Sequence, residues 1–222
     1  MSRRACERND NSDSMTSGLP IGILDFGSAG NVKSVANAFK RAGVKARLIR
    51  SYSPQMGLSG LVMPGVGSFS VVPGIIRSLG GKERAASIKI PVLCICLGMQ
   101  ALFPKSEECR KAKGLGIIEG KVRRIRGLVQ LPQLGWNQVY QARKDALFFG
   151  IKNGEYFYFA NSYAAFPSNG SNTLASTEYG ERFASTVRYE NWYGVQFHPE
   201  KSGRAGLKLI KNFAAICRRR VK

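Results

Sequence analysis

The sequence predicts an α/β fold: an open mixed, mostly parallel sheet with helices on both faces and an antiparallel extension toward the C-terminus. Two patterns indicate this. Up to about residue 103, short apolar runs alternate with loops and with segments of helical apolar spacing, which is typical of parallel strands joined by crossover helices. From about Gly114 onward, short alternating segments separated by turn residues replace that pattern.

The first part of the chain supplies the parallel strands and their helices. Residues 19–26 form a short apolar run, which predicts a strand buried on both faces. Val32, Val35 and Phe39 then recur at helical spacing before Gly43, a residue that commonly ends helices. By the same reasoning we expect strands at 45–49, 60–63 and 91–95, and helices at 32–42, 71–79 and 97–103.

The second part supplies shorter strands and a closing helix. Alternating segments, each expected to be an antiparallel or mixed strand, cover 121–126, 138–142, 156–160, 173–177, 183–187 and 192–197. Residues 203–217 carry their apolar side chains on one helical face, so we expect a helix that closes the domain. No internal repeat or linker is visible, which predicts one domain at 19–222.

Composition limits the class of protein. Residues 1–18 are polar and lack an apolar core, which predicts a disordered extension and excludes a secretory signal. No apolar run approaches the roughly 20 residues that a membrane helix needs, so no membrane association is expected. Five cysteines without framework-like spacing fit reduced thiols in a cytoplasmic protein. One histidine and scattered cysteines provide no paired ligands for a metal.

The charge is unusually basic, with 34 Lys+Arg against 14 Asp+Glu and a net charge of +20. Such a surplus raises the possibility of nucleic-acid binding. The basic residues are dispersed, however, apart from clusters at 121–126 and 218–222, and no known nucleic-acid-binding motif accompanies them. We therefore favour a cationic surface that meets an acidic partner, anionic substrates or solvent.

Cys96 is the strongest candidate nucleophile. It lies between the apolar strand 91–95 and a helix that begins at Leu97. A tight turn there lifts a side chain above the sheet, and the positive end of the helix favours a thiolate. A buried core cysteine is the alternative interpretation of the same pattern. Cys94 is expected to be packed in the core, because the turn makes Cys96 the outward residue.

His198 is the chain's single histidine, so any chemistry that needs an imidazole must use it. It follows a predicted strand, and catalytic groups of α/β sheets gather at strand ends. Glu200 is close enough to orient the ring, although it could instead cap the following helix. Cysteine, histidine and acid together form the parts of a nucleophilic triad. The turn Pro64-Gly65-Val66-Gly67 follows another strand and could present backbone N–H groups to an oxyanion.

These stretches together resemble a known family. Cys96-Leu97-Gly98-Met99-Gln100 followed by His198-Pro199-Glu200 is similar to the pattern of class I (triad) glutamine amidotransferases, whose fold is flavodoxin-like. Within that class the chain resembles the glutaminase subunits of imidazole glycerol phosphate synthase. The stretches that carry this narrower resemblance are Asp25-Phe26-Gly27…Gly30-Asn31…Ser34-Val35, Pro64–Phe69, Leu134-Gly135-Trp136-Asn137 and Val195–Ser202, within about Pro20 to Cys217.

The resemblance implies glutamine hydrolysis without a cofactor. Cys96 would attack the side-chain amide, His198 would transfer protons and Glu200 would orient His198. Val66 and the N–H of Leu97 would stabilise the oxyanion. The remaining positions that match the family's oxyanion and glutamine-binding residues are Gly65, Gly67, Gln100, Ser162 and Tyr163.

The resemblance also implies a heterodimer in which ammonia passes to a (β/α)₈-barrel subunit. There it would form imidazole glycerol phosphate in histidine biosynthesis. The positions expected at this interface are Asn31, Gln133, Trp136, Asn137 and Lys201.

The chain departs from the family pattern at four places. Cys94 stands where the turn usually begins with glycine, and the loop after Asp25 is one residue longer than usual. Gln133 and Asn161 stand where the family has histidines. These departures, with the unusual charge, leave open a related subunit that supplies ammonia to another acceptor, such as a surface-polysaccharide sugar. The net charge of +20 leaves open a second alternative, a cationic nucleic-acid-binding protein.

Overall fold

The computed structural model describes residues 18–27 and 32–219. The predicted disordered extension, apart from Gly18, lies outside these ranges, as do Asn31 and the end of the C-terminal basic cluster. Within the described residues, eleven strands form one sheet whose main path runs β2-β1-β3-β4-β11-β10-β9-β6-β7. The strands differ in direction between the two ends of this path.

The parallel end is built from short apolar strands. Each strand pairs in parallel with its neighbours in the order β2, β1, β3, β4, β11. Their bounds are Ala46–Ile49 (β2), Ile21–Leu24 (β1), Gly60–Met63 (β3), Val92–Ile95 (β4) and Trp192–Val195 (β11). Every residue of the four strands other than the edge strand β2 is buried, as expected for strands covered on both faces.

The antiparallel end continues the sheet from β11. Strands β10, β9, β6 and β7 pair antiparallel in that order, and β8 joins β5 to β10. Their bounds are Gly120–Arg124 (β5), Gln133–Gln141 (β6), Glu155–Asn161 (β7), Tyr163–Pro167 (β8), Thr173–Tyr179 (β9) and Glu181–Tyr189 (β10). This part contains more strand pairs than the parallel part.

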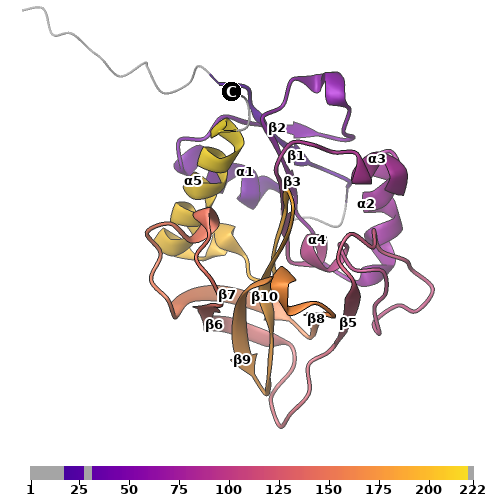
Figure 1. The fold of residues 1–222 in the computed structure, drawn as a ribbon, viewed down its shortest axis with the longest axis vertical. Coiled ribbons are helices and arrows are strands. Elements are labelled where there is room, and N and C mark those ends of the chain that lie inside the picture. Colours follow the sequence, from indigo (N-terminus) through magenta and orange to yellow (C-terminus); the bar gives the residue numbers. More distant parts are fainter. Residues whose placement is uncertain (1–17, 28–31, 220–222) are drawn as a thin grey trace, which may run out of the picture.

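Helices cover both faces of the parallel end (Figure 1). α1 and α5 lie on one face, and α2, α3 and α4 lie on the other. Their bounds are Val32–Arg41 (α1), Val72–Ser78 (α2), Lys82–Ala86 (α3), Leu97–Gln100 (α4) and Gly203–Arg219 (α5). Short 3₁₀ turns occupy Pro54–Met56 (η1), Phe69–Val71 (η2), Ala146–Phe148 (η3), Gly170–Asn172 (η4) and Pro199–Lys201 (η5).

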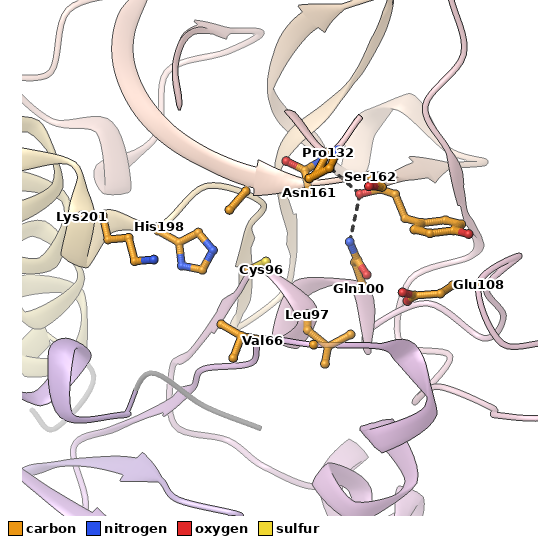
Figure 2. Close-up of a pocket in the computed structure, with 13 residues that line it drawn as sticks. Val66, Cys96, Leu97, Gln100, Glu108, Pro132, Asn161, Ser162, His198 and Lys201 are labelled. Carbon is orange, nitrogen blue, oxygen red and sulfur yellow. Dashed lines mark hydrogen bonds between the residues drawn. The ribbon is translucent and has the colours of Figure 1, made fainter. Parts of the chain in front are cut away.

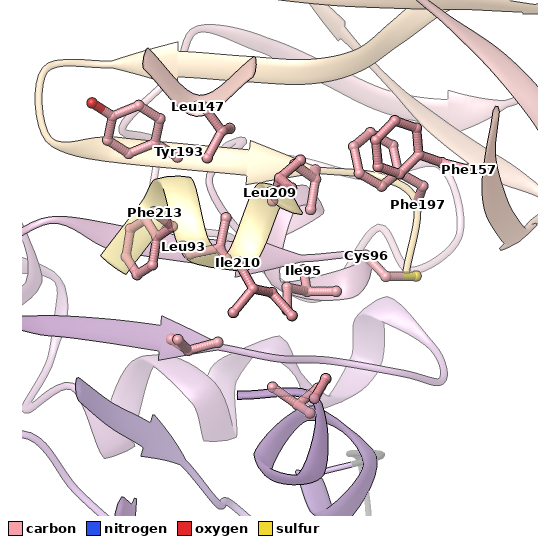
Figure 3. Close-up of a cluster of buried hydrophobic side chains, with 14 of the residues drawn as sticks. Leu93, Ile95, Cys96, Leu147, Phe157, Tyr193, Phe197, Leu209, Ile210 and Phe213 are labelled. Atoms are coloured by element: carbon pink, nitrogen blue, oxygen red, sulfur yellow. The ribbon is translucent and has the colours of Figure 1, made fainter. Parts of the chain in front are cut away.

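Each face of the sheet has its own apolar core. Figure 3 shows the core of the α5 face, where Leu209 and Ile210 pack with Leu93 and Ile95 of β4. The other face packs α2 and α4 against residues of β3 and β4 that point the opposite way. Burial of these side chains on both faces stabilises the sheet and fixes where its strands end.

The mixed sheet with helices on both faces agrees with the predicted fold class, but some elements differ. β8 was not expected, because Tyr163–Pro167 places two alanines side by side and ends in proline, so it lacks alternation. The five-residue helix α3 was not expected either. β6 begins at Gln133, five residues before the expected start, and its early residues pair with β7. Among the described residues, no helix has the length and apolarity needed to cross a bilayer.

Candidate active site

Three turns meet at one edge of the sheet, each at the carboxyl end of a parallel strand. Pro64–Gly67 follows β3, Cys96 follows β4 and His198 lies shortly after β11. β4 lies between β3 and β11, with Ile95 opposite Val195. Carboxyl ends of adjacent parallel strands are where α/β sheets gather ligand-binding residues, so the topology itself brings these turns together.

Cys96 occupies a sharp turn between β4 and α4. Its φ of 53° is a left-handed value that a non-glycine residue rarely adopts. Its backbone N–H donates to the carbonyl of Val195 at 2.7 Å, which ties the turn to β11. A Cβ on Gly98 would collide with the carbonyl oxygen of Met63, so the close approach of this turn to β3 requires glycine there.

Cys94 and Cys96 face different cores, although they are two residues apart. Cys96 belongs to the core on the α5 face (Figure 3), whereas Cys94 packs on the opposite face with Leu97. The turn at Cys96 breaks the strand alternation that would have aligned the two side chains. Burial raises the pKa of the Cys94 thiol well above its usual value. Cys94 is therefore a packed core residue, as the sequence predicted.

His198 and Glu200 form a buried pair on the β11 side of Cys96. The Nδ1 of His198 lies 2.8 Å from Oε1 of Glu200, and their side chains are 3% and 1% exposed. Two further bonds fix the backbone of His198: its N–H donates to the carbonyl of Tyr158 at 2.8 Å, and its carbonyl accepts from the hydroxyl of Ser202 at 2.6 Å. The imidazole is thus oriented by both its side chain and its backbone.

The electrostatics of this pair favour a charged imidazole. Burial opposes the charge, but hydrogen bonds with Cys96 and Glu200 outweigh burial and raise the pKa of His198 from 6.5 to about 10. Because Nδ1 faces Glu200, Nε2 is the nitrogen that faces the sulfur. The raised pKa of His198 beside a cysteine is the arrangement that nucleophilic cysteine catalysis uses.

Cys96 and His198 open into a cavity of about 590 Å³. Figure 2 shows Cys96 between His198 on one side and Gln100 with Glu108 on the other. Of the predicted oxyanion and substrate residues, the cavity is lined by Val66, Gly67, Leu97, Gln100, Ser162 and Tyr163. Gln100 donates from Nε2 to the carbonyl of Tyr163 at 3.0 Å, which fixes one wall.

Gly65 is placed differently from the other predicted residues. It is buried and does not line the cavity, and its carbonyl accepts a hydrogen bond from the N–H of Leu97 at 3.1 Å. A Cβ at Gly65 would lie 2.8 Å from the backbone nitrogen of Gly98. The N–H of Leu97, the expected oxyanion donor, is therefore already bonded within the chain.

Two residues at the site were missed by the sequence analysis. Glu108 lines the cavity, and its Oε2 accepts the N–H of Phe69 at 2.7 Å. Gln196 is fully buried and donates from Nε2 to the sulfur of Cys96 at 3.6 Å. Glu108 lies in a charged loop with no local pattern. The position of Gln196 two residues before His198 was the only available signal.

The expected interface residues divide into exposed and buried ones. Trp136 is 54% exposed on β6, beside Leu134 at 67%, and Lys201 is exposed at the rim of the cavity. Asn137 instead points its amide at the carbonyl of Glu178, 2.9 Å away. Gln133 is 3% exposed. Asn31 lies outside the described residues.

Gln133 and Asn161, which stand where the resemblance led us to expect histidines, are opposite each other across β6 and β7. Both are buried, and the amide oxygens of both and the amide nitrogen of Gln133 have no hydrogen-bond partner among the described residues. Asn161 also lines the cavity. The same ranges contain no group of three metal-ligating side chains.

Comparisons with known proteins agree on one family. The class I glutamine amidotransferase family model matches residues 22–217. The imidazole glycerol phosphate synthase subunit HisH of Escherichia coli K12 is 43% identical over 196 residues, covering 88% of this chain and 98% of that protein. The HisH subunit of Moorella thermoacetica is 39% identical over 202 residues, covering 90% and 96%. That of Methanocaldococcus jannaschii is 41% identical over 199 residues, covering 88% and 99%.

Solved structures extend the similarity to the fold. The crystal structure of a putative GMP synthase subunit from Thermoplasma acidophilum aligns with a TM-score of 0.69 at 19% identity, covering 92% of this chain and 96% of that one. A crystal structure described as a glutamine amidotransferase aligns with a TM-score of 0.66, also at 19% identity, covering 89% and 98%. At this level of identity the similarity supports the fold alone.

Proposed function

This chain belongs to the class I glutamine amidotransferases and, within them, to the HisH subunits of imidazole glycerol phosphate synthase. On that premise we propose that Cys96, His198 and Glu200 hydrolyse glutamine and that the ammonia passes to a (β/α)₈-barrel synthase subunit. The observation that carries this proposal is the buried His198, which is hydrogen-bonded to Glu200 and to a cysteine that opens into a 590 Å³ cavity. A single domain of residues 19–222 in a cytoplasmic heterodimer is part of the same proposal.

The geometry suits a two-step acyl transfer. The thiolate of Cys96 attacks the side-chain carbonyl carbon of glutamine, and the carbonyl electron pair moves to oxygen. As the carbon–nitrogen bond breaks, Nε2 of His198 gives its proton to the departing nitrogen, which releases ammonia and leaves a γ-glutamyl thioester. His198 then removes a proton from water, which attacks the thioester, releases glutamate and returns the thiolate. Glu200 keeps the ring in place through both steps.

The oxyanion must be stabilised on the other side of Cys96. The N–H of Leu97 is the nearest helix-start donor, but it is bonded to the carbonyl of Gly65. The turn at Gly65 and Val66 therefore has to move before this N–H can bind an oxyanion. We expect the free chain to hydrolyse glutamine slowly for this reason.

Glu108 adds a substrate-binding residue to those expected from the sequence. Its carboxylate faces the cavity on the side away from His198 (Figure 2). One of its oxygens is held by the N–H of Phe69, so the side chain is fixed before substrate arrives. A fixed carboxylate is suited to pairing with the α-ammonium group of glutamine.

The proposed partner surface lies beside the cavity on β6 and β7. Leu134, Trp136 and Tyr156 are large exposed side chains on these strands, and Lys201 stands at the cavity rim with its Nζ 5.5 Å from the ring centre of Tyr158. Large exposed aromatic side chains are enriched at protein interfaces. A barrel subunit bound here would receive ammonia without its release to solvent.

The proposal is tested by purifying the chain with the barrel subunit and measuring glutamate release and imidazole glycerol phosphate formation. We expect both products when glutamine and the barrel's phosphoribosyl-formimino-carboxamide ribonucleotide are supplied. The chain should also restore growth of a histidine auxotroph that lacks the HisH subunit. Glutamate release without rescue, despite stable expression, would favour the alternative of another ammonia acceptor.

A further inference from the structure

Gln196 places a second polar contact on the sulfur of Cys96, in addition to that of His198. The side chain is fully buried, and its Nε2 lies 3.6 Å from Sγ of Cys96. Its backbone N–H donates to the carbonyl of Ser185 at 2.9 Å. The neighbouring carbonyl of Val195 accepts the backbone N–H of Cys96 at 2.7 Å. Gln196 and Cys96 are therefore fixed relative to each other by the sheet.

The direction of the Gln196 amide is set by its neighbours. Its Oε1 accepts a hydrogen bond from Nε2 of Gln100 at 3.1 Å. The same Nε2 of Gln100 also donates to the carbonyl of Tyr163 at 3.0 Å, so it is defined as the donor in both bonds. Because an amide has one oxygen and one NH₂ group, Gln196 must then present its NH₂ group to the sulfur.

This arrangement gives the sulfur a donor without a titratable proton. A neutral N–H donor stabilises an anionic sulfur more than a neutral thiol, since a hydrogen bond to a charged group is the stronger one. His198 also favours the thiolate, but it has to give up its proton during the reaction. An amide keeps its hydrogens throughout both steps.

We propose that Gln196 is a positioning residue for the nucleophile, which donates to the Cys96 thiolate in a direction that Gln100 fixes. The proposal rests on the proposed function, because it takes Cys96 as the nucleophile. The hydrogen bond between Gln100 and Gln196 also connects the substrate cavity to the nucleophile, since Gln100 lines the cavity and orients the amide that contacts the sulfur.

The test is the pH dependence of Cys96 alkylation by iodoacetamide, followed by mass spectrometry of the peptide that contains Cys96. This readout reports thiolate formation and needs neither glutamine nor a partner. The variants are Gln196→Met, which keeps the volume but has no donor, and Gln196→Glu, which replaces the donor with an oxygen. Asn212→Asp is the matched control, because Asn212 is another buried amide that donates to backbone carbonyls, those of Leu147 and Phe149.

We expect alkylation of Cys96 near pH 6 to slow about tenfold in Gln196→Met and by at least as much in Gln196→Glu, the scale of one hydrogen bond to a charged group. Asn212→Asp should leave the pH profile of Cys96 unchanged, and the half-exposed Cys109 should react equally in all proteins. Should Gln196→Met fail to fold, Gln100→Met tests the same link, because it removes the bond that orients Gln196.

The outcomes separate the inference from the function on which it rests. Unchanged alkylation profiles in folded Gln196 variants, with or without a loss of turnover, would overturn the role of Gln196 and leave the nucleophile in place. A wild-type protein whose Cys96 reacts no faster than Cys109 at any pH would contradict the assignment of Cys96 itself.

Discussion

On one side of Cys96, hydrogen bonds already join the side chains that are proposed to transfer protons and to hold the sulfur. His198 contacts Glu200 at 2.8 Å, and Gln196 reaches the sulfur at 3.6 Å. On the other side, the N–H of Leu97 is bonded to Gly65, a partner within the chain. We call these the proton-transfer side and the oxyanion side. In the proposed mechanism the first needs no rearrangement, whereas the second has to rearrange.

The difference follows from what holds each side in place. The proton-transfer side is anchored by β4, β11 and the backbone bonds of His198, all of them buried. The oxyanion side is the turn Pro64–Gly67, whose last residues are partly or fully exposed. In the proposed mechanism the nucleophile is therefore in place before the turn moves, and turnover depends on the movement of the turn. Substitutions on the two sides should therefore have different consequences.

The largest effect is expected on the proton-transfer side. His198→Asn removes the imidazole that carries the proton, so glutamate release should fall on the order of a thousandfold or more, the scale seen for triad residues. Alkylation of Cys96 at neutral pH should slow as well. Both are measured on the complex, and a loss of less than about tenfold would mean that His198 has a structural role.

A smaller and more selective effect is expected on the oxyanion side. The Cβ added in Gly65→Ala would lie 2.8 Å from the nitrogen of Gly98 and would displace the turn. The displaced turn would also carry Val66, the other expected oxyanion residue, out of place. Turnover should therefore fall on the order of a hundredfold, the cost of losing one oxyanion donor, while alkylation of Cys96 should be unchanged.

The control for Gly65→Ala is Gly74→Ala in α2, where an added Cβ has its nearest neighbour 3.7 Å away. This variant should retain full turnover. Equal losses of alkylation and turnover in Gly65→Ala would remove the distinction between the two sides.

Substitutions on the proposed partner surface should change binding of the barrel subunit and should not directly change either side of Cys96. Truncation of the half-exposed Trp136 in Trp136→Ala should weaken binding of the barrel subunit roughly thirtyfold, as for an aromatic residue that dominates an interface. Leu48→Ala is a suitable control, because Leu48 is similarly exposed on β2, at the opposite end of the strand order. Titration calorimetry measures both, and equal affinities for the two variants would place the interface elsewhere.

The proton-transfer side should also affect the stability of the fold. The pKa of His198 is raised from 6.5 to about 10 in the folded chain. Stability from this shift is fully present below pH 6.5 and is lost as the pH rises toward 10, because the folded state then no longer binds the extra proton. The difference in unfolding free energy between wild type and His198→Asn should therefore shrink over this range in urea titrations. A constant difference would show that the proton is not held in the folded state.

Most residues of the proton-transfer side could be predicted from local sequence patterns. The single histidine, its neighbour Glu200 and a cysteine after an apolar strand each had a local signature, and the sheet brings them together. The contact between Gln196 and the sulfur had no such signature, because it joins residues 100 positions apart. Glu108 was missed for the same reason, since only the folded loop turns it into the cavity.

Prediction of the fold from sequence was limited in a similar way. The buried parallel strands were predictable because a short apolar run bounded by turn residues is typical of a strand that is covered on both faces. β8 was not, since its pairing with β5 and β10 is long-range and its sequence does not alternate. The early part of β6 was missed because Gly135 and Asn137 interrupt its apolar pattern, and pairing with β7 stabilises it instead.

The most direct test compares two nitrogen sources for the complex with the barrel subunit, using Cys96→Ala. Synthesis from glutamine should be lost while synthesis from added ammonium continues at the wild-type rate, because only ammonia production depends on Cys96. Continued glutamine-dependent synthesis by Cys96→Ala would show that this cysteine is not the nucleophile.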